Sequence, residues 1–187
     1  MIKKHYYNWQ DIERMCVSIV NQMYKDNWRP DYIVGITRGG NIPATIISNM
    51  IGIRCESLKV SLRDNDGYGS ETNCWMSEDA FGYVDLEQQG TLKSRWDISK
   101  RKNILIVDDI NDTGATFNWI KQDWQSSCLP NEDAWKTVWG KNVRFATLTE
   151  NLSSEFDDTV NYTCHEVNKA EEDVWLVYPW ENVGTYA

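Results

Sequence analysis

The stretch at residues 104–116 constrains the fold more than any other part of the sequence. Its first four residues, Ile-Leu-Ile-Val, predict a strand that is buried on both faces near the centre of a parallel sheet. Two acids follow, then a turn with a glycine, and a helix is expected over about 115–126. Because open α/β sheets bind ligands beyond the carboxyl ends of their strands, this turn is a candidate ligand site.

The rest of the chain alternates between segments of strand type and helix type. Apolar residues recur at helical spacing over about 9–26, and Pro30 follows them. Pro43 is expected to open a second helix, which Gly52 ends. Short apolar or alternating runs predict strands at 31–37, 55–62, 143–148 and 160–165. This order predicts an α/β fold with a mostly parallel central sheet flanked by helices, in one domain spanning 1–187.

Two segments do not fit this alternation. Residues 63–101 are rich in glycine and polar residues, and we expect a long loop or hairpin over the body of the domain. Loops of this length inside compact domains are usually functional lids or mobile segments. Residues 127–142 look like a second insertion, for which the sequence offers no role.

Composition excludes several classes of function. The net charge of −9 repels nucleic acid and anionic membranes, so neither is an expected partner. No stretch reaches transmembrane length. The five cysteines form no CxxC pair and only two histidines are present, which argues against a zinc site. Scattered cysteines and the lack of an apolar leader favour reduced thiols in the cytoplasm.

The turn after the central strand combines acids with anion-binding groups. Asp108 and Asp109 end the apolar run, and Asp112 is a third acid in the turn. Thr113, Gly114, Ala115 and Thr116 then open the helix. Backbone amides, two hydroxyls and the positive end of a helix dipole suit a phosphate monoester, and a glycine lets the backbone approach it closely. A ribose 5-phosphate fits this site, because its hydroxyls can donate to the acids while its phosphate binds the turn.

A second glycine turn lies earlier in the chain, at residues 35–43. It again separates a strand from a helix. Arg38 offers forked donors that suit a pyrophosphate, and Gly39 and Gly40 expose amides. This motif alone is weakly specific, but its order and distance relative to residues 104–116 give it weight.

Together the two motifs resemble those of the type I phosphoribosyltransferases. The resemblance implies binding of 5-phosphoribosyl-1-pyrophosphate with Mg²⁺, and a cis peptide between Thr37 and Arg38. It implies that Asp108 and Asp109 orient the ribose and the metal, and that Asp112 accepts a proton from the base. It assigns the 5-phosphate to Thr113, Gly114, Ala115 and Thr116, and the pyrophosphate to Arg38, Gly39 and Gly40. The alternative is a strand–turn–helix with acidic decoration, as in a receiver domain.

The C-terminal segment narrows the resemblance. Residues 172–181 are similar to the hood of bacterial xanthine-guanine phosphoribosyltransferases, which implies a small hood over 166–187 built from the chain ends. In that subfamily an aromatic at the position of Trp175 stacks on the purine, and the backbone of the next residue, here Leu176, contacts the base. An acid at the position of Glu181 helps to bind the metal. The alternative for Trp175 is an ordinary core or interface aromatic.

Two departures from the family pattern leave the base open. Purine enzymes of the 6-oxo class carry a base-contacting lysine where this chain has Asn151, and an amide suits a 6-oxo or a 6-amino purine. Lys141 and Lys169 are alternatives at the wrong sequence offset. The flexible loop of the family begins with Ser-Tyr, whereas Leu62 follows Ser61 here.

The resemblance predicts Mg²⁺-dependent transfer of the phosphoribosyl group to a purine in salvage, with guanine, xanthine or hypoxanthine favoured. Residues 63–101 would then close over the site and exclude water. The alternatives are a non-catalytic sensor of the donor, or a transferase acting on adenine or a pyrimidine. Relatives of this type form dimers or tetramers, so a homo-oligomer is expected.

Overall fold

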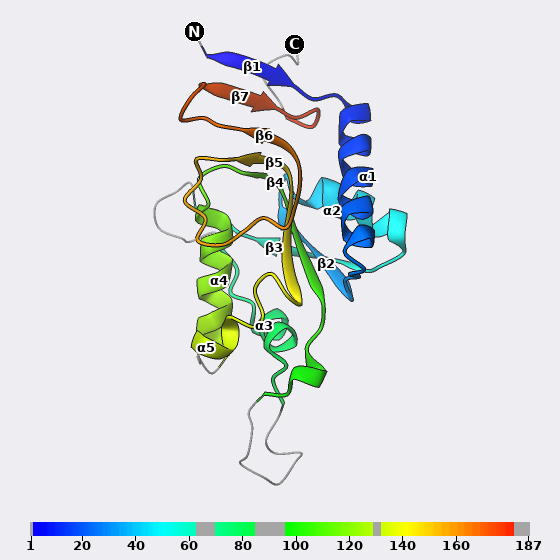
Figure 1. Ribbon diagram of the computed structural model, residues 1–187, viewed down its shortest axis with the longest axis vertical. Coiled ribbons are helices and arrows are strands. Elements are labelled where there is room, and N and C mark those ends of the chain that lie inside the picture. The colour runs from blue at the N-terminus through cyan, green and yellow to red at the C-terminus, as the bar shows by residue number, and fades with distance from the viewer. Residues whose placement is uncertain (1, 63–69, 85–95, 129–131, 182–187) are drawn as a thin grey trace.

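A five-stranded parallel sheet forms the centre of the molecule (Figure 1). The computed structural model describes residues 2–62, 70–84, 96–128 and 132–181. The strands are β2 Tyr32–Thr37, β3 Cys55–Lys59, β4 Ile104–Asn111, β5 Val143–Asn151 and β6 Tyr162–Val167. Their order is β3-β2-β4-β5-β6, and every neighbouring pair is parallel. The predicted α/β class is confirmed, and β4 occupies the centre.

Strand β4 is buried on both faces, as its apolar run predicts. Ile104 and Ile106 pack into one hydrophobic cluster, and Leu105 and Val107 pack into another, because successive side chains of a strand point to opposite faces. Helices α1 and α2 cover one face, and α3, α4 and α5 cover the other (Figure 1). The helices are α1 Trp9–Lys25, α2 Asn41–Ile51, α3 Cys74–Phe81, α4 Ala115–Ser127 and α5 Glu132–Trp135.

The helix boundaries follow local chemistry. Asn8 and Asp11 form a reciprocal capping box at the start of α1. Helix α2 begins at Asn41 rather than at Pro43, because the first turn of a helix tolerates a proline. It ends, as predicted, at Gly52, which adopts the left-handed conformation with φ of 69°. Within the described ranges no helix is long and apolar enough to cross a bilayer.

The prediction of a loop over 63–101 is wrong for part of that segment. Residues 63–69 and 85–95 lie outside the described residues, but between them the chain forms α3. The helix buries Met76, Ala80 and Phe81 in the core. This part of the segment is therefore a structural layer of the domain, and its polar flanks concealed a short amphipathic helix.

The insertion at 127–142 also contributes to the core. Outside 129–131, which are not described, it contains α5 and a following turn. The ring centroids of Trp135 and Trp139 lie 5.2 Å apart, and those of Trp124 and Trp139 lie 5.9 Å apart. Because Trp124 lies on α4, these rings pack the insertion against α4 in the core, which accounts for three of the ten tryptophans.

The two ends of the chain pair to form the hood, defined here as β1 (Lys3–Tyr6) and β7 (Val174–Val177). These strands make a separate two-stranded parallel sheet in which Tyr6 is opposite Val177. Figure 1 shows them beyond the β6 edge of the main sheet. The predicted hood from the chain ends is confirmed, although its first two residues, 166 and 167, belong to β6 and residues 182–187 lie outside the described residues.

Candidate active site

The two predicted acids lie within β4, which continues past them to Asn111. Asp108 Oδ1 accepts a hydrogen bond from the Asp109 amide at 2.9 Å, and Asp109 Oδ1 accepts one from the Ile110 amide at 2.8 Å. Burial, and then the neighbouring charge of Asp109, raise the pKa of Asp108 well above its ordinary value. Such a pair favours a ligand that brings hydroxyl donors or a cation.

The turn after β2 lies directly against these acids. A methyl group at Gly39 would stand 2.1 Å from Asp109 Oδ2, and one at Gly40 would stand 2.5 Å from a main-chain oxygen of β4. Only glycine permits this approach without displacing its neighbour. The Thr37–Arg38 peptide is cis, as the resemblance implies, and Arg38 is exposed. The structure thus brings the predicted pyrophosphate turn and the predicted ribose acids together.

The turn between β4 and α4 has the geometry of an anion site. Gly114 adopts the left-handed conformation with φ of 89°, and a methyl group there would stand 2.3 Å from the Phe156 nitrogen. Gly114 is the cap residue of α4 and has no side chain to cap the helix, whereas Thr113 Oγ1 accepts a hydrogen bond from the Ala115 amide at 3.3 Å. Thr113 and Ala115 are exposed and Thr116 is half-buried. These groups can hold a phosphate as predicted.

Asp112 forms an ion pair that the sequence did not predict. Lys169 Nζ lies 2.9 Å from Asp112 Oδ1, and the two side chains remain 27% and 43% exposed, respectively. Asn151 binds both partners: its Nδ2 donates to the Asp112 carbonyl oxygen at 2.9 Å, and its Oδ1 accepts from the Lys169 amide at 3.0 Å. A cation and a carboxylate are therefore held side by side next to the phosphate turn.

Asn151, which was predicted to contact the base, is engaged in hydrogen bonds within the protein. It is 6% exposed, and its Oδ1 also accepts from the amide and hydroxyl of Ser153. Both ends of its amide thus bind the protein. The position of Lys169 in the sequence had argued against its being the base-contacting lysine. In the β5–β6 pair, however, Asn151 is opposite Val167, and Lys169 follows two residues later. Strand register, which the offset does not show, places this lysine at the site.

Strand β7 of the hood exposes an aromatic side chain. Trp175 is 47% exposed, whereas its neighbours Val174 and Leu176 are buried. Lys4 Nζ lies 4.5 Å from the centroid of the Trp175 ring. Trp175 is therefore not a core residue, and its indole can stack on a flat base. Because the side chain of Leu176 is buried, its backbone is the part that a base could contact.

Asp108 and Asp109 fit a magnesium ion that a substrate completes. Mg²⁺ is usually bound by one or two carboxylates together with phosphate oxygens and water. Gly39 leaves space for the Asp109 carboxylate beside the pyrophosphate turn. Among the described residues no three acids, histidines or cysteines gather into a metal site without the substrate. Glu181 Oε2 accepts from the Tyr178 amide at 3.1 Å, and its role at the metal stays a prediction.

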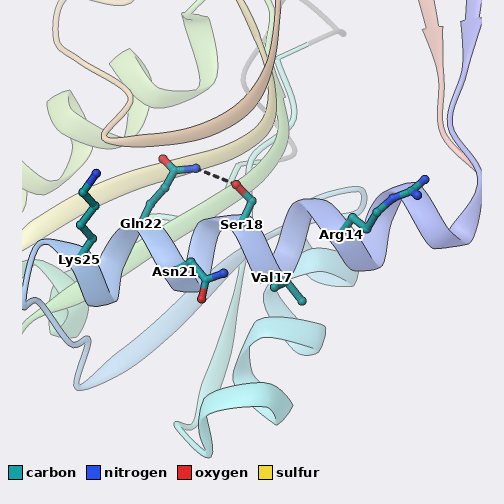
Figure 2. A pocket seen from close by; sticks show the side chains of 6 residues that line it. All are labelled: Arg14, Val17, Ser18, Asn21, Gln22 and Lys25. Atoms are coloured by element: carbon teal, nitrogen blue, oxygen red, sulfur yellow. Dashed lines mark hydrogen bonds between the residues drawn. The ribbon is translucent and has the colours of Figure 1, made fainter.

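A separate pocket lies on the outer face of α1 (Figure 2). It is lined by Arg14, Val17, Ser18, Asn21, Gln22 and Lys25. Gln22 Nε2 donates to Ser18 Oγ at 3.2 Å and to the Thr163 carbonyl oxygen at 2.9 Å. The pocket contains none of the predicted site residues.

Comparisons with known proteins agree with this geometry. Residues 3–179 match the family described as Phosphoribosyl transferase domain. The chain is 26% identical over 200 residues to the hypoxanthine-guanine phosphoribosyltransferase of Schizosaccharomyces pombe, covering 94% of this chain and 88% of that protein. It is 23% identical over 194 residues to xanthine phosphoribosyltransferase 1 of Saccharomyces cerevisiae, covering 96% and 90%.

The fold is similar to that of solved structures that are also named as phosphoribosyltransferases. For a purine phosphoribosyltransferase from Pyrococcus horikoshii the TM-score is 0.63 at 21% identity, covering 100% of this chain and 99% of that one. For a xanthine-guanine-hypoxanthine phosphoribosyltransferase from Helicobacter pylori it is 0.61 at 15% identity, covering 95% and 93%. With the family match over residues 3–179, these observations show that the chain belongs to the phosphoribosyl transferase domain family.

Proposed function

We propose that the chain transfers the 5-phosphoribosyl group from phosphoribosyl pyrophosphate to a 6-oxopurine, with Mg²⁺, and releases pyrophosphate. Family membership supports the reaction class. The relatives are named for hypoxanthine, guanine and xanthine, which are all 6-oxopurines. The product is a nucleotide made from a free base, so the reaction is one of purine salvage.

The donor binds across the end of β4. The exposed turn at the start of α4 takes the 5-phosphate through backbone amides and the Thr113 hydroxyl. Asp108 and Asp109 accept hydrogen bonds from the ribose hydroxyls. Arg38, with the amides of Gly39 and Gly40, holds the pyrophosphate, and the missing side chain of Gly39 leaves room for the Asp109 carboxylate.

The chemistry needs one proton acceptor and stabilisation of positive charge on the ribose. N9 of the base forms a bond to C1 of the ribose while the bond from C1 to the pyrophosphate oxygen breaks. The proton on N7 passes to the Asp112 carboxylate. The carboxylates of Asp108 and Asp109 stabilise the positive charge that develops on the sugar. Mg²⁺, when bound, supplies positive charge to the leaving pyrophosphate.

The ion pair of Asp112 and Lys169 carries the choice of base. A 6-oxopurine presents O6 beside N7 on one edge, whereas adenine presents an amino group there. With its proton on N7, an oxopurine offers an acceptor and a donor side by side. Lys169 Nζ and Asp112 Oδ1, 2.9 Å apart, present the complementary donor and acceptor. The amino group of adenine would instead point a donor at the ammonium.

A base panel tests this proposal. The protein is mixed with the donor, Mg²⁺ and each of guanine, xanthine, hypoxanthine, adenine and uracil, and nucleotide and pyrophosphate are measured. We expect turnover with the oxopurines and little with adenine or uracil. Efficient turnover with adenine or uracil would contradict the assignment of the base. Donor binding without turnover of any base would favour a sensor of the donor.

A lysine variant tests the contact itself. Lys169→Met removes a charged hydrogen-bond donor, so we expect the KM for guanine to rise about tenfold to a hundredfold, which corresponds to a loss of about 1.5–3 kcal/mol. Lys141→Met is the matched control, because Lys141 is exposed and lies outside the site. Equal KM values in the two variants would remove Lys169 from base recognition.

The predicted dimer or tetramer stays a prediction, which a measurement of the molar mass in solution tests.

A further inference from the structure

Four side chains from separate parts of the fold form one unbroken series of hydrogen bonds, called here the hydroxyl chain: His165, Tyr7, Thr149 and Tyr178. His165 Nδ1 contacts the Tyr7 hydroxyl, which lies 2.8 Å from Thr149 Oγ1. Thr149 Oγ1 lies 3.0 Å from the Tyr178 hydroxyl, and that hydroxyl lies 3.1 Å from the Asp109 carbonyl oxygen. The chain thus begins on β6 and ends at the main chain of a predicted ribose acid.

The direction of every bond follows from counting protons. A carbonyl oxygen can only accept, so the single proton of Tyr178 is donated to Asp109. The same hydroxyl also lies in donating geometry to Thr149 Oγ1, but one proton cannot serve both acceptors. With the Tyr178 proton assigned to Asp109, Thr149 donates to Tyr178 and Tyr7 donates to Thr149. The hydroxyls supply three protons for four bonds. The fourth proton must be on His165 Nδ1, which donates to Tyr7.

Because the hydroxyl chain is buried, the direction of its hydrogen bonds cannot easily reverse. Tyr7, Thr149 and Tyr178 are 7%, 0% and 3% exposed, so water cannot easily replace a missing partner. Burial raises the pKa of Tyr7 to about 12 and raises that of Tyr178 well above its ordinary value. Both phenols therefore keep their protons at neutral pH. Reversal of one bond would leave a buried donor or acceptor without a partner, which is costly.

The hydroxyl chain connects the hood to the donor end of the site. Tyr178 directly follows β7, which carries Trp175 and Leu176. The amide of Tyr7, which directly follows β1, donates to the Val177 carbonyl oxygen at 2.9 Å. The Tyr178 ring stacks on two aromatic rings. Its centroid lies 5.0 Å from that of Tyr7 and 4.9 Å from that of Trp180. The hydrogen bond from Tyr178 therefore fixes the position of β7, the strand that carries Trp175, relative to Asp109, the predicted ribose acid.

We propose that Tyr178 is a positioning residue for phosphoribosyl transfer, and that His165, as its Nδ1–H tautomer, orients the hydroxyl chain that holds it. The kinetic role rests on the proposed function, whereas the tautomer does not. Tyr178 sets the separation between the base on the hood and the ribose carbon that it attacks.

Nuclear magnetic resonance tests the tautomer without any turnover. The chain has only two histidines, His5 and His165, so a long-range proton–nitrogen spectrum of the whole protein is assigned by comparison with His165→Asn. We expect the His165 ring to carry its proton on Nδ1 near pH 8. A proton on Nε2 alone, or averaging between the two tautomers, would overturn the proton order. A protein that turns over no base would contradict the proposed function and leave this result unchanged.

Kinetics test the positioning role. Tyr178→Phe keeps the ring stack but loses the hydroxyl, so we expect kcat to fall about tenfold while the KM for the donor changes little. His165→Asn keeps an N–H at the position of Nδ1 and should retain nearly full kcat, whereas His165→Leu should lose part of it. In the Tyr178→Phe background, His165→Leu should cause no further loss, because the chain is already broken. Additive losses, or an unchanged kcat in Tyr178→Phe, would overturn the role.

Discussion

The donor end and the base end of the site are built in different ways. The donor end comes from one continuous stretch, residues 104–116, and one glycine turn that packs on it. The proposed base end combines the ion pair of Asp112 with Lys169, which follows β6, and Trp175 on the hood. Local sequence therefore determines the geometry of the donor end. The proposed base end depends on strand register and on the pairing of the two chain ends.

Removal of magnesium should give the largest effect, and only at the donor end. With excess chelator we expect turnover to fall by about a hundredfold or more, because the leaving pyrophosphate loses several kcal/mol of charge stabilisation. Thermal unfolding of the ligand-free protein should not change, because the described residues form no group of three metal ligands without the substrate. Full activity in chelator, measured as pyrophosphate release, would contradict a metal-assisted donor site.

Gly39→Ala should separate activity from stability at the donor end. The new methyl group would stand 2.1 Å from Asp109 Oδ2, and the flexible carboxylate can move away, so the fold survives while the ribose acid is displaced. We expect kcat/KM for the donor to fall about a hundredfold, because small misplacement of reacting groups is costly. The midpoint of thermal unfolding should stay close to that of the wild type.

Gly52→Ala is the converse control. Gly52 has φ of 69° and no atom within 4 Å of a new methyl group. We expect a loss of about 1 kcal/mol in the free energy of unfolding, from backbone strain alone, with unchanged kcat/KM. If both glycine variants lost stability and activity in the same proportion, close packing on Asp109 would not be the reason that activity requires a glycine at position 39.

Trp175→Ala should affect the base end alone. Stacking on a base is worth about 1–3 kcal/mol, so we expect the KM for guanine to rise about tenfold while the KM for the donor stays the same. Trp75→Ala is a matched control, since Trp75 is 43% exposed on α3 and contacts Tyr32 and Arg54. A rise in the donor KM of Trp175→Ala would show that the two ends are not independent.

The same contrast explains how far the sequence could predict the structure. The central strand, the acids and both glycine turns follow from motifs in which each group is close to the next along the chain, whereas the cis peptide was implied by the family resemblance. The hood followed from the resemblance of residues 172–181. Helix α3 was missed because its eight residues carry a weak apolar pattern between polar flanks, and only its packing under α4 shows that it belongs to the core.

Contacts between distant residues account for the other differences. Asn151 and Lys169 are eighteen residues apart, and only the β5–β6 register shows that the second reaches Asp112. Bonded residues of the hydroxyl chain lie up to 158 positions apart, and of its members only Tyr178 belongs to a stretch that the sequence analysis singled out, residues 172–181. A sequence pattern records neighbours along the chain, so partners that meet through sheet pairing leave little signal in it.

The pH dependence of stability should give the smallest effect, and it tests the hood side of the comparison. Burial, and then the charge of His5, lower the pKa of His165 in the folded protein below its ordinary value. As the pH falls through about 6.5, the unfolded chain therefore gains a proton at this histidine before the folded chain does, and stability is lost. His165→Asn keeps the N–H donor but does not titrate, and its acids are those of the wild type. We expect urea unfolding to show a larger loss of stability in the wild type than in His165→Asn between about pH 8 and about pH 5.5. An equal loss in the two proteins would mean that His165 takes up its proton as readily in the fold as in the unfolded chain, so its contacts with Tyr7 and His5 would be looser than the structure shows.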